Sequence, residues 1–423
     1  MGSYTKRWWA SERAGIDVPR RDRANGAYRA YIPDRLLDRA FVLPGDVSAD
    51  AVDASLALSR LDSQARTLTN TESLARLLLR AESTASSHIE GLTISPQRLL
   101  REELKRAEGV VSNDTTALEV LANIDAMEFA IGGTGDITIE RLVEVHRRLL
   151  MPTRAKAYAG VIRSEQNWIG GSQYTPIGAK YVPPPPELVM DLLEDLCAFC
   201  NADDLPAVIQ AAIAHAQFES IHPFADGNGR TGRALIYMVL RKRGLAIHAT
   251  PPISLLLATQ TNAYISCLDA MRFEGVPNSK ASRDALFTWV GFFSSACVQA
   301  VREAEEFERR VLAIQGQWRN RLAHLRSDST AFAIIDTLPV TPIITVSSAA
   351  SVTGKTFNAA NNAIEQLVAV GILKSTKVGT RNRSFEATEL IGIFAGLERK
   401  LASPALNTQI SKPIRNVPFL RDH

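Results

Sequence analysis

The segment His222–Arg233, which reads HPFADGNGRTGR, gathers a histidine, a carboxylate, two glycines and two arginines within twelve residues. It joins two apolar, helix-like stretches, 208–218 and 230–240, so a glycine-rich turn leads into a helix. The free backbone N–H groups at such a helix N-terminus form a site for anions. The residue types and their spacing therefore predict a phosphate-binding loop.

Individual side chains in this segment suit that chemistry. Arg230 and Arg233 are three residues apart, so they emerge on the same side of the helix, and their forked guanidinium groups match phosphate oxygens. The single carboxylate, Asp226, suits a magnesium ion shared with phosphates better than an all-protein metal site. His222 precedes a proline, which predicts an extended backbone outside the helix.

The loop resembles the signature of the Fic family, H-x-F-x-[D/E]-G-N-G-R-x-x-R, at every specified position. The resemblance covers about residues 60–320 and includes AHAQFESIHPF, QNWIGG and AKYVPPPPEL. It implies a mainly α fold, with a Fic-type helical core and a β-hairpin flap. It also implies a protein adenylyltransferase, which moves AMP from ATP to a Ser, Thr or Tyr hydroxyl of a target protein.

The same resemblance assigns roles to named residues. His222 would deprotonate the attacking hydroxyl, and Asp226 would hold Mg²⁺ against the α- and β-phosphates of ATP. The nucleotide-binding set would be Gly227, Asn228 and Gly229 in the anion hole, Arg230 and Arg233 on the β- and γ-phosphates, and Tyr264 near the adenine. A core position for Tyr264 is the alternative. Doc-type protein kinases carry Lys at the position of Gly229, so the glycine favours AMP transfer, although another nucleotide-linked donor stays open.

Two further segments belong to the resemblance. Residues 168–182 would form the flap, whose exposed strand edge binds a target segment through backbone hydrogen bonds; an ordinary surface hairpin is the alternative. Ser86 and Glu90, in SSHIEGL, are four residues apart and share a helix face, which alone indicates only an amphipathic helix. Their pattern is similar to the family's inhibition motif, [S/T]-x-x-x-E-[G/N], and implies that Glu90 pairs with Arg233 and withholds it from the γ-phosphate.

The elements that must position these residues are mostly helices. Apolar spacing predicts helices over 54–107, 115–131, 139–150 and, with breaks, 187–325, whereas 1–50 reads as an irregular arm. The predicted domains are a 1–110 arm and helical region with the inhibitory helix at 73–91, a 111–325 catalytic core, a 328–392 winged helix, and a 393–423 tail.

The region 328–392 shows three short helical stretches followed by a two-stranded hairpin, the pattern of a winged helix-turn-helix. Five basic residues are offset there by five acidic ones; they are Lys355, Lys374, Lys377, Arg381, Arg383, and Asp328, Asp336, Glu365, Glu386, Glu389. A DNA-reading domain usually shows a clear basic face, so DNA binding stays open and protein docking is favoured.

The whole chain reads as an ordinary soluble protein. Its 423 residues carry a net charge of +3, with no signal peptide and no apolar run long enough to cross a membrane, which predicts a cytoplasmic location. The four cysteines are interpreted as free, buried thiols, and His146 and His215 as core or surface histidines. Self-modification and a homodimer are possible. Two alternative functions stay open: removal of AMP from a modified protein, and a nucleotide-sensing regulator that binds DNA.

Overall fold

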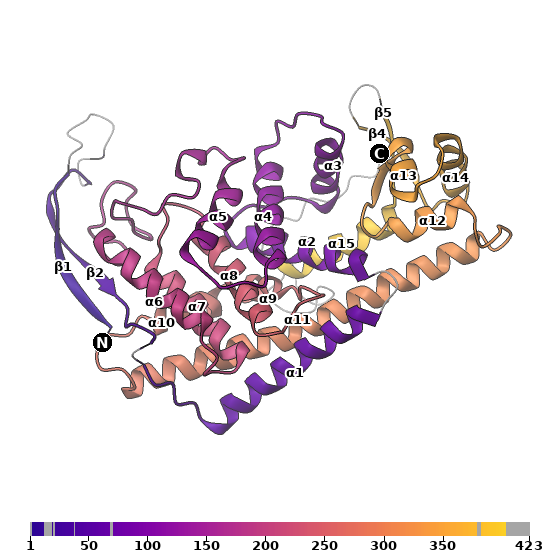
Figure 1. The fold of residues 1–423 in the computed structure, drawn as a ribbon. Helices are drawn as coiled ribbons and strands as arrows, with labels where there is room; N and C mark the ends of the chain where they lie inside the picture. Colours follow the sequence, from indigo (N-terminus) through magenta and orange to yellow (C-terminus); the bar gives the residue numbers. More distant parts are fainter. Residues whose placement is uncertain are drawn as a thin grey trace. The chain divides into compact units, whose positions relative to one another are not determined.

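The computed structural model describes residues 2–11, 19, 22–37, 39–67, 71–378 and 382–402. The chain is mainly helical, as predicted (Figure 1). It forms two compact units. The first unit consists of 1–56, 126–245 and 262–295, and the second of 57–125, 246–261 and 296–423. Both units combine segments that are distant in the sequence, which a division into contiguous domains does not describe.

The N-terminal region is not the irregular arm that the sequence predicted. Strands β1 (Ser3–Trp9) and β2 (Gly26–Ile32) pair in antiparallel register, with Ser3 opposite Ile32 and Trp9 opposite Gly26 (Figure 1). The support comes from distant parts of the first unit: the Tyr31 N–H donates to the Val182 carbonyl at 2.9 Å, and the Tyr31 hydroxyl donates to the Phe273 carbonyl at 3.0 Å. Such long-range partners leave no local signal in the sequence.

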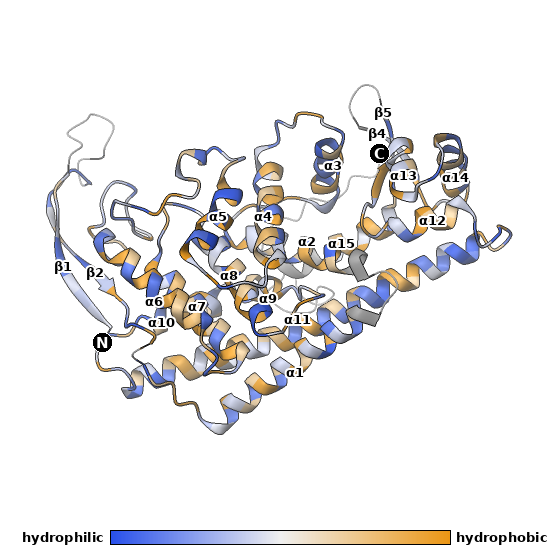
Figure 2. Ribbon diagram, viewed as in Figure 1, coloured by the Kyte–Doolittle hydropathy of each residue, from blue (hydrophilic) through white to orange (hydrophobic). Residues whose placement is uncertain are grey.

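Apolar helices form the core of the first unit. They are α5 (Ile139–Leu150), α6 (Val189–Asn201), α7 (Ala207–Ile221), α8 (Asn228–Lys242) and α10 (Thr261–Met271). Two 3₁₀ turns lie at Lys156–Tyr158 and Pro186–Leu188. Three helices contribute residues to both units: α1 (Gly45–Thr67), α4 (Thr115–Gly132) and α11 (Lys280–Arg321). Every residue of α7 is buried and most of them are apolar (Figure 2), and most residues of α8 are buried as well. A helix buried on all sides holds its ends at defined positions, and the loop 222–227 joins two such helices.

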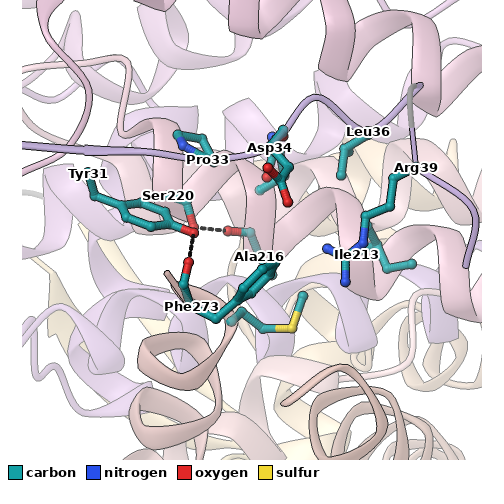
Figure 3. A pocket seen from close by; sticks show the side chains of 11 residues that line it. Tyr31, Pro33, Asp34, Leu36, Arg39, Ile213, Ala216, Ser220 and Phe273 are labelled. Atoms are coloured by element: carbon teal, nitrogen blue, oxygen red, sulfur yellow. Dashed lines mark hydrogen bonds between the residues drawn. The ribbon is translucent and has the colours of Figure 1, made fainter. Parts of the chain in front are cut away.

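A small cavity of about 20 Å³ borders the last turns of α7 (Figure 3). It has room for about one water molecule, and polar groups of Asp34, Arg39 and Ser220 line it. The side-chain amide of Gln217 donates to the Asp34 carbonyl at 2.7 Å, which ties the segment after β2 to α7. The N-terminal region is therefore part of the framework that supports the end of α7.

The long helix α11 is apolar enough, by length and composition, to cross a membrane. However, 56% of its apolar window is buried within the protein, and its Trp289 donates to the Ala212 carbonyl of α7 at 2.8 Å. These contacts are those of a core helix. The four cysteines are free and buried, as expected, and burial raises the pKa of the Cys197 thiol to about 12.

The second unit contains the helix that carries the predicted inhibition motif. Its elements are α2 (Thr71–Ile89), α3 (Pro96–Ala107), α9 (Ile253–Thr259), α12 (Thr330–Thr337), α13 (Val346–Thr353), α14 (Phe357–Ala369), α15 (Thr388–Ala402) and strands β3 (Ile343–Thr345), β4 (Lys374–Val378) and β5 (Asn382–Glu386). In α2, the buried carboxylate of Glu82 accepts the Ser254 N–H at 2.7 Å at the start of α9. This contact fixes α2 against α9.

The C-terminal elements follow the predicted pattern of helices and hairpin. The structure adds β3, which the sequence did not predict, in a sheet of order β3–β5–β4, and α15 extends into the region predicted as a tail. Arg381, in the hairpin turn, and residues 403–423 lie outside the described residues. Glu386 is buried against Arg101 of α3 at 2.7 Å, so it does not offset the basic charges at the surface. The winged-helix identification and any DNA binding stay predictions.

Candidate active site

His222 ends α7 in a conformation that the sequence did not predict. Its φ and ψ are 50° and 60°, in the left-handed region, and its N–H donates to the Phe218 carbonyl at 2.9 Å as the helix C-cap. The expectation of an extended backbone before Pro223 is therefore wrong. A left-handed residue other than glycine is unusual and is maintained only where its surroundings hold it.

Two side chains that the sequence analysis did not single out hold this turn. Arg163 donates to the His222 carbonyl at 2.9 Å and to the Pro184 carbonyl at 2.6 Å, and Asn167 donates to the carbonyls of His222 at 3.3 Å and Phe224 at 2.9 Å. Arg163 is buried, and burial lowers its pKa to about 10. Arg163 and Asn167 precede the flap and Pro184 follows it, so these hydrogen bonds connect the His222 turn to both ends of the flap.

The glycine-rich loop leaves the N-terminus of α8 open. Gly227 has φ 75°, and α8 begins at Asn228 without a side chain capping it. The Asn228 side chain instead closes the loop on itself, accepting the Phe224 N–H at 2.9 Å and donating to the Phe224 carbonyl at 2.8 Å. Asn228 therefore shapes the loop, and binding of an anion by the backbone N–H groups of 227–229 stays a prediction.

Asp226 is exposed at the edge of this loop. One of its carboxylate oxygens accepts the Gly227 N–H at 2.6 Å. Among the described residues, no group of three or more His, Cys, Asp or Glu side chains could hold a metal. A single carboxylate beside an anion site fits Mg²⁺ that arrives with phosphates, because Mg²⁺ in such sites takes one or two carboxylates plus phosphate oxygens and water.

Arg230 and Arg233 lie in the first turns of α8 and are 5% and 1% exposed. Close to them, His215 of α7 is fully buried, and burial together with the Arg233 charge lowers its pKa to about 3. A neutral His215 therefore adds no positive charge to this region. The two arginines bring concentrated positive charge to the end of α8 at which the backbone already favours anions.

Tyr264 is 3% exposed and lies in the core of the first unit. Its hydroxyl is 2.7 Å from Nε2 of His215, and the two rings stack with centroids 5.9 Å apart. This placement matches the core alternative for Tyr264. A contact with adenine stays a prediction.

Gly232, which the sequence analysis did not single out, is required for the close approach of α7 and α8. A Cβ atom at this position would lie 2.6 Å from Oε1 of Glu219 and 2.9 Å from Cδ1 of Phe218. Gly232 is thus the point at which α8, which carries both arginines, packs against α7, which presents His222.

We expect Gly232→Ala to lower the free energy of unfolding by about 1–3 kcal/mol, the usual cost of overpacking a core. The matched control is Gly291→Ala in α11, where an added Cβ meets no atom within 4 Å and helix propensity favours alanine. Denaturant titration of both variants checks this, and equal stability of the two would contradict the close packing.

The predicted flap is a hairpin with a single bridge. Ile169 and Tyr181 exchange both backbone hydrogen bonds, at 2.8 and 3.1 Å, and Gly170 and Gly171 adopt positive φ in the turn. The indole of Trp168 packs edge-on against Trp9 of β1, with ring centroids 5.4 Å apart. Binding of a target at this flap stays a prediction.

Ser86 and Glu90 differ in environment, although the sequence placed them on one helix face. Ser86 is buried in α2, whereas Glu90 is exposed in the turn that follows Ile89, just before Gly91 with φ 84°. The helix ends one residue earlier than the predicted pattern needs. The pairing of Glu90 with Arg233 stays a prediction.

Comparison with known proteins finds two family models that match this chain, one of them across the loop. Residues 136–240 match the Fic/DOC family model, and residues 49–132 match the model of the Fic/DOC family N-terminal region. The first of these ranges contains the whole of His222–Arg233. The resemblance inferred from the signature is therefore confirmed.

The curated relatives match over limited segments. Protein adenylyltransferase fic-1 of Caenorhabditis elegans is 34% identical over 134 residues, covering 31% of this chain and 23% of that protein. Protein adenylyltransferase Fic of Culex quinquefasciatus is 30% identical over 201 residues, covering 44% and 38%. This chain thus spans less than two-fifths of either relative. A solved Fic family protein from Desulfovibrio desulfuricans G20 is 20% identical with a TM-score of 0.49, over 82% of this chain and 98% of that one.

Proposed function

We propose that this chain, which carries a Fic/DOC domain preceded by a Fic/DOC N-terminal domain, transfers AMP from ATP to a hydroxyl side chain of a target protein. The observation that carries the proposal is the loop between α7 and α8. It combines an uncapped helix N-terminus, two arginines and a histidine held in a left-handed turn. The relatives named protein adenylyltransferase support the same reaction.

The proposed reaction assigns each group one task. His222 accepts the proton of the target hydroxyl, whose oxygen attacks the α-phosphorus of ATP, and the bond between that phosphorus and the oxygen bridging to the β-phosphate breaks. AMP stays on the target and pyrophosphate leaves. The N–H groups at the start of α8 bind the phosphates, and Arg230 and Arg233 neutralise the β- and γ-phosphates. Alignment and charge neutralisation account for most of the rate increase in such transfers.

Asp226 is the residue that we propose to hold Mg²⁺, which supplies charge neutralisation on the phosphates when it is bound. The carboxylate orientation is set within the chain by the hydrogen bond from the Gly227 N–H. The N–H groups at the start of α8 and the two arginines bind and orient the triphosphate. No protein ligand beyond Asp226 is proposed.

A label on the α-phosphate of ATP tests the transfer directly. Incubation with a lysate, followed by mass spectrometry of the labelled band, should identify a protein with a mass increase of one AMP on a Ser, Thr or Tyr. A parallel reaction with the label on the γ-phosphate should leave that band unlabelled. Label retained from the γ-phosphate, with none from the α-phosphate, would indicate phosphoryl transfer and contradict the proposal.

We expect Asp226→Ala to reduce Mg²⁺-dependent transfer by roughly 100-fold, since a lost metal ligand removes several kcal/mol of charge stabilisation. Excess Mg²⁺ should restore little of it. The control is Asp191→Ala, an exposed carboxylate in the first turn of α6. Transfer rates measured across a Mg²⁺ series check the prediction, and a wild-type rate for Asp226→Ala would place the metal on another residue.

A further inference from the structure

His146 of α5 is fully buried, with 0% exposure, beside the loop that follows His222. Its ring lies flat on Phe224, with centroids 3.7 Å apart and an angle of 7° between the planes. Nδ1 lies 3.0 Å from the Gly160 N, and Nε2 lies 2.9 Å from the Asp226 carbonyl oxygen. One imidazole therefore contacts two segments that are far apart in the sequence.

These partners define the tautomer of the ring. The Gly160 N–H can only donate, so Nδ1 accepts, and the ring proton is on Nε2, which donates to the Asp226 carbonyl. Both ring nitrogens are satisfied, and neither is available for proton transfer to a substrate.

The peptide between Asp226 and Gly227 is consequently held from both sides. His146 fixes its carbonyl, and the Asp226 carboxylate accepts its N–H at 2.6 Å. The His146 ring also limits the space at Gly227, where a Cβ atom would lie 3.4 Å from ring atoms Cδ2 and Nε2. If this peptide rotated, the carboxylate would lose its N–H donor and change direction.

We propose that His146 is a positioning residue that orients the Asp226 carboxylate toward the metal-bound triphosphate, an inference that rests on the proposed function. His146 does not touch the substrate or the reacting atoms. It acts by fixing the backbone carbonyl of the residue that presents the carboxylate. Residues in this role typically change metal affinity or activity 10–100-fold when they are replaced.

Two variants separate the contact with Asp226 from the contact with Gly160. In His146→Gln the amide NH₂ takes the place of Nε2–H and donates to the Asp226 carbonyl. In His146→Asn the shorter amide oxygen takes the place of Nδ1 and accepts the Gly160 N–H, but no donor reaches Asp226. Both variants lose the ring stacked on Phe224, so they differ mainly in which hydrogen bond survives.

The measurement is calorimetric binding of ATP over a range of Mg²⁺ concentrations, which needs no turnover. We expect His146→Asn to raise the Mg²⁺ concentration for half-maximal ATP binding roughly 10–100-fold. For His146→Gln, this Mg²⁺ concentration should stay within about 3-fold of that of the unmodified protein, because the hydrogen bond to the Asp226 carbonyl is kept. A variant that only folded correctly, without this hydrogen bond, would not show the same recovery. Equal Mg²⁺ requirements for the two variants, or a larger one for His146→Gln, would overturn the proposal.

One control separates this result from a loss of stability, and one outcome separates it from a failure of the proposed function. Leu142→Ala removes a buried side chain from the same helix and keeps the His146 side chain. It should lower the melting temperature and leave the Mg²⁺ requirement unchanged. A protein that transfers no AMP, but still shows the difference between His146→Gln and His146→Asn, would contradict the proposed function and retain the positioning role.

Discussion

Replacement of His222 by alanine is expected to reduce AMP transfer by about 10²–10⁴-fold while ATP binding stays nearly unchanged. The reason is that His222 is assigned to the target hydroxyl, whereas the phosphates are assigned to the α8 N-terminus and the arginines. The left-handed backbone of His222 affects the choice of substitution. Alanine adopts φ 50° less readily than asparagine does, so a loss of activity in His222→Ala alone combines a missing base with a strained turn.

His222→Asn is therefore the informative second variant. Asparagine tolerates the left-handed conformation but does not serve as a base near neutral pH, so both variants should be inactive and both should bind ATP. His324→Ala, at an exposed histidine of the second unit, is the matched control. Rates and ATP affinities measured side by side check the prediction. Wild-type transfer by His222→Asn would remove His222 from the role of base.

The helices of the core could be predicted from the sequence because their signals are local. The helix predicted over 139–150 has the same bounds in the structure as α5, and α4 and α8 differ from their predicted limits by only a few residues. Apolar spacing and caps such as Thr138, whose side chain accepts the Arg141 N–H, lie within each segment. The strands β1 and β2 lacked such a signal, because their support comes from Val182 and Phe273.

The residues of the candidate loop could be predicted from the sequence, but the side chains that hold the loop in place could not. The types and spacing of 222–233 predicted the loop, because binding a phosphate would select residues of these types. Arg163, Asn167 and His146 act instead on carbonyl groups of the loop, and a carbonyl is the same for every residue type. Only the folded backbone shows which carbonyl a side chain reaches. The left-handed turn at His222 was missed for the same reason.

Replacement of Glu90 by glycine is the second large expected effect, an increase in transfer. The motif around Ser86 and Glu90 implies that this carboxylate competes with the γ-phosphate for Arg233. A hydrogen bond to a charged group contributes about 1.5–3 kcal/mol, so an Arg233 released from such a competitor corresponds to roughly a 10–100-fold gain. Glu90 lies in the turn after α2, and α2 is anchored through Glu82 to the start of α9, so the change removes the carboxylate without loosening that anchor.

Glycine in this turn could also loosen the end of α2, and Glu90→Gln separates the two causes because it keeps the side-chain volume and removes only the charge. Both variants should gain activity and self-modification if competition for Arg233 is the mechanism. Combining Glu90→Gly with Arg233→Ala should then cancel most of the gain, because the two residues act on each other and their effects are not additive.

Equal activity of Glu90→Gly and the unmodified protein toward every hydroxyl acceptor would contradict inhibition by Glu90. A fall in AMP removal from a pre-modified target, with no gain in transfer, would assign Glu90 to the reverse reaction instead, since a carboxylate that positions water is needed only in that direction.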